Sequence, residues 1–125
     1  MDLDSLAARL AAARQMEAKV DGATFKLEVP SEHAWRVTYE EHRNTAGDLL
    51  YARASRAILD KALIGWDGVT AKHLLPDAPE EAIAFSPAAR SMLLDARTDI
   101  ADELKIALID KANSAREARE AARKN

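Results

Sequence analysis

The first hydrophobic residues of the chain recur at alternating spacings of three and four residues, as they would on one face of a helix. The pattern predicts a helix over residues 3–20, which the turn-forming pair Asp21-Gly22 would end. The face that must pack against something consists of Leu3, Leu6, Leu10, Ala13, Glu17 and Val20. It is too short for a coiled coil, so we expect it to contact this chain or a partner.

The hydrophobic period changes to two in the next segment. Polar and apolar residues alternate over residues 24–29, which predicts a strand that buries Phe25 and Leu27 on one face. A single strand leaves its backbone groups unpaired, so it needs a second strand. Residues 82–85, Ala-Ile-Ala-Phe, are the best candidate within this chain, and the alternative is a strand of another chain.

Further helices are predicted from hydrophobic stripes, some of which follow a capping residue. Residues 32–43, after Ser31, and residues 48–64 are two of them. Ser86, followed by proline, opens another helix with Met92, Leu93 and Ala96 on its apolar face, and Thr98 can cap a continuation. Between them we expect a turn over residues 65–69 and a connecting loop over residues 70–82.

Large hydrophobic residues are missing after residue 113. We therefore expect a single helical domain with a β element over residues 1–113, and a charged tail, helical or frayed, over residues 114–125. The predicted fold class is α+β, mostly α, with four or five helices and one minor two-stranded β element. That element would pair residues 24–29 with residues 82–85.

Composition excludes several classes of protein. The length of 125 residues suits one domain, and the absence of cysteine rules out disulfides, zinc ribbons and a thiol nucleophile. The net charge of −3 argues against a dedicated nucleic-acid binder, whose phosphate contacts need a basic face. No apolar run is long enough for a membrane span, and the acidic start does not resemble a signal peptide, so we expect a cytoplasmic protein.

No motif points to catalysis or to a bound cofactor. The three histidines, His33, His42 and His73, lack the spacing of metal ligands on a helix. The serines lack a glycine elbow, and the glycines do not form a phosphate-binding loop. We therefore expect a protein without enzymatic activity, metal ion or cofactor.

Aromatic residues are the more informative side chains. Trp35 and Tyr39 lie one helical turn apart, and Trp66 follows the main helix. Such residues fill cores, but they also dominate protein-binding surfaces, and the sequence leaves both interpretations open. The candidate partner-binding residues are Leu3, Leu6, Leu10, Trp35, Tyr39 and Trp66.

Two motifs follow each other in the middle of the chain. Residues 64–69 read Ile-Gly-Trp-Asp-Gly-Val, and after an acidic, proline-containing loop residues 85–87 read Phe-Ser-Pro. In this order, and within residues 24–96, they resemble the tail assembly chaperones of long-tailed bacteriophages and prophages. The resemblance does not cover the first helix or the last thirty or so residues.

The resemblance implies a non-enzymatic protein that acts during virion morphogenesis. Such chaperones bind the long helical tape measure protein, help to recruit tail tube subunits, and are absent from the mature virion. We therefore expect these two partners and the host cytoplasm as the location. Many copies would be needed along a long helix, which makes a homo-oligomer compatible with this role.

Two other functions stay open at this point. One is a structural virion protein such as a head–tail connector, which would remain in the particle. The other is a small DNA-binding regulator, for which basic residues on helices, such as Arg53 and Arg56, would supply phosphate contacts.

Overall fold

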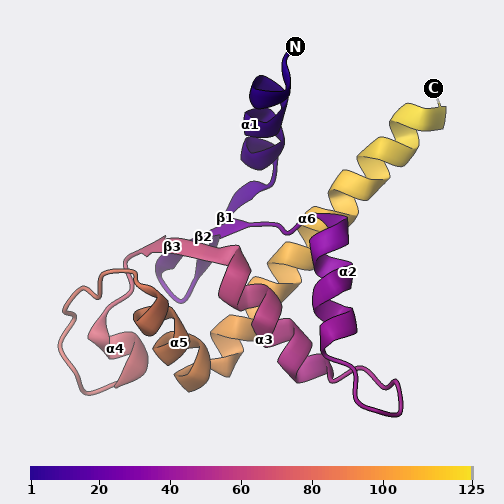
Figure 1. Cartoon of the computed structure of the whole chain (residues 1–125). Helices are drawn as coiled ribbons and strands as arrows, with labels where there is room; N and C mark the ends of the chain where they lie inside the picture. The colour runs from indigo at the N-terminus through magenta and orange to yellow at the C-terminus, as the bar shows by residue number, and fades with distance from the viewer. Residues whose placement is uncertain (125) are drawn as a thin grey trace.

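One antiparallel sheet and six helices make up residues 1–124, the part of the chain that this computed structural model describes (Figure 1). The strands lie in the order β1-β2-β3. In chain order the elements are α1 (Leu3–Ala13), β1 (Gln15–Val20), β2 (Ala23–Glu28), α2 (Glu32–Glu41), α3 (Tyr51–Ala62), β3 (Leu63–Asp67), α4 (Ala71–Leu74), α5 (Pro87–Ala96) and α6 (Thr98–Lys124).

The predicted helix over residues 3–20 is wrong in its second half. Helix α1 ends at Ala13, and the chain then forms β1, which pairs with β2 in an antiparallel hairpin. Asp21 and Gly22 both have positive φ, 50° and 80°, as a type I′ turn requires. This turn matches the twist of the two strands, so it favours a hairpin over a longer helix.

The predicted two-stranded element is also wrong, because the sheet has three strands. Strand β2 pairs with β1 on one side and with β3 on the other, and residues 82–85 do not pair with it. Ala82 instead forms an isolated bridge with Thr70. The segment expected to be a turn after the main helix is β3, so both sides of β2 find partners within the chain.

The core lies between the sheet and three helices. Phe25 and Leu27 of β2 are completely buried, as are Leu104 and Leu108 of α6, and α3 and α5 complete the same cluster. Strand β1 contributes partly buried hydrophobic residues to this cluster. The 27-residue helix α6 contacts β1, α3 and α5 and therefore connects most of the core.

Helix caps follow the sequence closely. The Ser31 hydroxyl accepts a hydrogen bond from the Ala34 N–H at 3.1 Å, and the Ser86 hydroxyl accepts one from the Ala89 N–H at 3.0 Å. Both caps were predicted and are confirmed. Four or five helices were expected, and residues 1–124 contain six, because a short helix, α4, interrupts the predicted loop over residues 70–82.

The charged segment after residue 113 continues α6 as regular helix to Lys124, and Asn125 lies outside the described residues. Every residue from 114 to 124 is exposed. Arg119 forms an ion pair with Glu32, at the start of α2, and Arg116 lies 3.9 Å from the same carboxylate. These charges connect the exposed part of α6 to the body of the protein.

Candidate partner-binding surface

Helix α1 stands away from the body of the protein (Figure 1). The Asp2 carboxylate caps it by accepting a hydrogen bond from the Ser5 N–H at 2.7 Å, which satisfies one of the free N–H groups of the first turn. This hydrogen bond also lowers the pKa of Asp2 below its usual value. No residue of α1 is buried, so the helix gains little from packing against its own chain.

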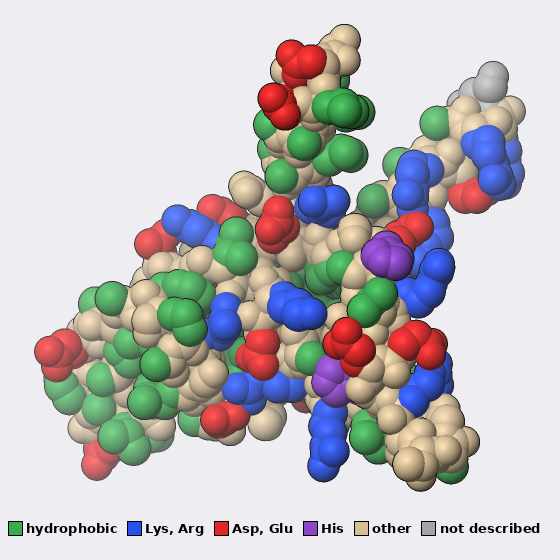
Figure 2. All heavy atoms as spheres, viewed as in Figure 1, with side chains coloured by type: hydrophobic (Ala, Val, Ile, Leu, Met, Phe, Trp, Pro, Cys, Tyr) green, Lys and Arg blue, Asp and Glu red, His purple; other side chains and the backbone are tan. Residues whose placement is uncertain are grey.

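The three leucines of α1 are exposed large hydrophobic residues that follow one another along a single helix. Leu3 is 82% exposed, Leu6 is 43% exposed and Leu10 is 52% exposed. Figure 2 shows hydrophobic side chains along α1, with acidic side chains near its tip. Solvated leucines in a row cost free energy, so a helix that presents them is suited to contact a partner.

Trp35 and Tyr39 lie together on α2 but apart from α1. Their rings meet edge to face with centroids 6.4 Å apart, and both are partly buried against the core. Neither residue is fully buried, so part of each aromatic side chain on α2 is accessible to solvent.

Trp66 is a core residue. Only 7% of it is exposed, and its ring packs edge to face against Phe25 and Phe85. Its indole N–H donates a hydrogen bond to the carbonyl of Ile83 at 2.8 Å. The structure thus separates the six candidate residues into an exposed group on α1, a half-buried pair on α2, and one tryptophan inside the protein.

A second apolar surface was not predicted from the sequence. A pocket of about 170 Å³ lies among β3, α4 and α5, and Met92 at its edge is 59% exposed. Met92, Leu93 and Ala96 were expected on the inner face of this helix, but Met92 and Ala96 are exposed, and the buried residues are Leu93 and Leu94. The proline-containing segment before α5 gave no periodic signal that could have predicted this surface.

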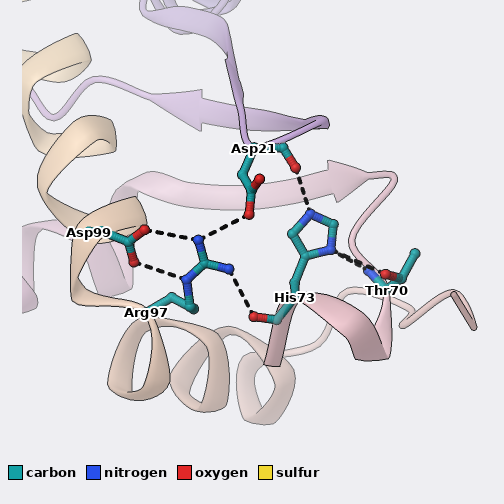
Figure 3. Close-up of polar contacts among 5 residues, drawn as sticks. All are labelled: Asp21, Thr70, His73, Arg97 and Asp99. Atoms are coloured by element: carbon teal, nitrogen blue, oxygen red, sulfur yellow. Dashed lines mark hydrogen bonds and ion pairs between the residues drawn. The ribbon is translucent and has the colours of Figure 1, made fainter. Parts of the chain in front are cut away.

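A polar cluster joins the β1–β2 turn to α4 and to the junction of α5 and α6 (Figure 3). The Arg97 guanidinium binds the carboxylates of Asp99 and Asp21 and the carbonyl of His73, all at 2.9–3.0 Å. The His73 ring accepts a hydrogen bond from the Thr70 N–H at Nδ1 and donates from Nε2 to the Asp21 carbonyl at 2.8 Å. Both ring nitrogens are hydrogen-bonded, and together with Arg97 the cluster ties the β1–β2 turn to α4 and to the α5–α6 junction.

The contact between Arg97 and Asp99 is expected to affect the stability of the fold in acid. Hydrogen bonding to Arg97 lowers the pKa of Asp99 to about 2. Because this pKa lies below the ordinary value near 4, the carboxylate stabilises the fold above about pH 4 and stops doing so as the pH falls through about 2. In thermal melts, D99N should therefore be less stable than the unaltered protein above pH 5, and the gap should close toward pH 2. A gap that stays constant down to pH 2 would contradict this assignment.

One further group of polar residues lies beside α3. In a shallow depression beside α3, the His42 ring is bonded to the Thr38 carbonyl, and Arg56 is paired with Asp60 and Asp95. Within residues 1–124 no three acidic or histidine side chains gather as metal ligands would. In the same residues no helix is long and apolar enough to cross a membrane.

No protein-family model, curated protein or solved structure matches the chain.

Proposed function

We propose that this protein is a tail assembly chaperone that covers the apolar face of a helical tape measure protein while a phage tail is built, and that it helps to recruit tail tube subunits. The observation that carries the proposal is the exposed leucine row on α1. The order of the two motifs within residues 24–96 supports it independently.

The physical need for such a protein is simple. A long amphipathic helix exposes a continuous apolar stripe and aggregates unless the stripe is covered. A short helix that presents Leu3, Leu6 and Leu10 can lie along this stripe and exclude water from it. Because α1 stands clear of the rest of the protein, a long client could pass it without colliding with the sheet (Figure 1).

Co-expression with the tape measure protein tests this function. We expect the tape measure protein to be insoluble alone, to become soluble when this chain is present, and to co-purify with it. A tape measure protein that stays insoluble, or that is equally soluble without this chain, would overturn the proposal.

The alternative functions predict different results. A head–tail connector would remain in purified particles, whereas a chaperone should be absent from them. A DNA-binding regulator would bind duplex DNA with an affinity that falls steeply with salt. Immunoblots of purified particles and a salt series of DNA-binding measurements separate the three functions.

A further inference from the structure

Strand β1 has one free edge. It lies at the end of the sheet, with β2 on its other side. Val20 and Ala23 close the two-residue turn as a hydrogen-bonded pair, so every second residue of β1 directs its backbone groups toward β2. The alternation continues to Arg14, whose carbonyl accepts the Val29 N–H at 2.8 Å.

The backbone groups of the intervening residues point away from the sheet. These residues are Gln15, Glu17 and Lys19, and within residues 1–124 their outward backbone groups have no hydrogen-bond partner. Their side chains are exposed, and within the same residues neither Glu17 nor Lys19 takes part in an ion pair. Such an edge is ready to pair with another strand.

We propose that two copies of this chain pair through β1 in antiparallel orientation, with Ala18 opposite the partner's Ala18, and so form a continuous six-stranded sheet. Hydrogen bonding requires the residues whose backbone groups point away from the sheet to face each other. This leaves three registers near the middle of β1, with the two-fold axis at residue 17, 18 or 19. One register opposes Glu17 with the partner's Glu17, and another opposes the two Lys19 side chains. Only the third pairs Glu17 with the partner's Lys19, and it does so twice.

The apolar face of β1 favours the same register. Met16, Ala18 and Val20 face the core but are only partly buried, because no strand lies beyond them. In the proposed register Met16 lies opposite the partner's Val20 on this face, twice across the two-fold axis. The pairing thus covers apolar area that a single copy leaves exposed.

The charge pattern identifies the occupant as a second copy. A Glu-x-Lys strand is its own complement when it is turned around, whereas an unrelated strand has no reason to match it in this register. Charged edge residues also discourage indiscriminate pairing, which fits an edge that accepts one partner strand. Pairing of two copies through β1 does not require the proposed chaperone function.

Charge reversal tests the register. We expect the unaltered protein to sediment as a dimer at high concentration, and E17K and K19E each to dimerise about 10-fold more weakly, because each places like charges opposite each other twice. The double variant E17K/K19E should recover the original affinity. Thermal melts check that each variant is folded, since residue 17 also lies opposite Lys26 of β2. An unaltered protein that is monomeric at every concentration, or a double variant as weak as the single ones, would overturn the proposal.

A cysteine crosslink tests the geometry separately. The chain has no cysteine, so A18C introduces a single thiol at the two-fold axis. Ala18 would oppose itself in a non-hydrogen-bonded pair, where side chains approach closely enough for a disulfide. We expect A18C to form a covalent dimer on mild oxidation and Q15C, an exposed residue far from its own copy in this register, to form little. Equal crosslinking of the two variants, or none from a folded A18C protein, would refute the pairing.

Discussion

Replacing Trp66 with alanine is expected to destabilise the protein by about 3–5 kcal/mol, a large part of the stability of a small domain. The side chain is 7% exposed, and its ring joins Phe25 of the sheet to Phe85 of the segment before α5. Alanine would leave a cavity between these two rings and an unpaired carbonyl at Ile83. Thermal melts should show a midpoint lower by about 10–20 °C.

A conservative variant separates the contributions of the ring. W66F keeps an aromatic side chain but removes the N–H donor to Ile83, so its stability should lie between those of W66A and the unaltered protein. If W66A melted at the same temperature as the unaltered protein, Trp66 would not be part of the core. The ring would then have to be considered again as surface for a partner.

Under the proposed function, replacing the three leucines of α1 with glutamine should abolish the solubilisation of a tape measure protein without unfolding this chain. Each leucine that a client covers contributes about 1.5–3 kcal/mol, so the triple variant L3Q/L6Q/L10Q should bind at least about 1,000-fold more weakly. The leucines are exposed, and glutamine is a good helix former, so the melting temperature should change little.

The matched control is another exposed hydrophobic residue away from α1. Ile106 on α6 is 58% exposed, and I106Q removes a similar apolar side chain from a different surface. Co-purification with the tape measure protein should survive in I106Q and disappear in the triple variant. A triple variant that still keeps the client soluble would show that α1 is not the binding surface, and the pocket beside Met92 would be the next surface to test.

The start of the chain shows how two local patterns can compete. Residues 3–20 carry apolar residues at helical spacing, but in their second half polar and apolar residues also alternate as in a strand. The Asp21-Gly22 pair that follows is a strong hairpin signal. The helical spacing predicted one helix across both halves. In the structure the hairpin prevails after Arg14, because β1 covers one side of β2 and adds Met16 to the core.

The segment after α3 was predicted wrongly for a different reason. The glycine in residues 63–67 suggested the end of a helix, yet these residues form β3, with Gly65 opposite Lys26 of β2. Nothing nearby in the sequence indicates this pairing, because its partner lies about forty residues earlier. The exposure of Met92 beside the buried Leu93 likewise depends on which helices pack against α5.

Local chemistry alone determined the capped starts of α2 and α5, the hydrophobic stripe of α3 and the buried face of β2, since each depends on residues within a few positions of one another. The tertiary structure decided the third strand, the burial of Trp66 and the isolation of α1, because these depend on segments far apart in the chain competing for the same apolar surface. A periodic pattern shows which face of an element is apolar, but it does not say whether that face meets the protein's own core or remains free for another molecule.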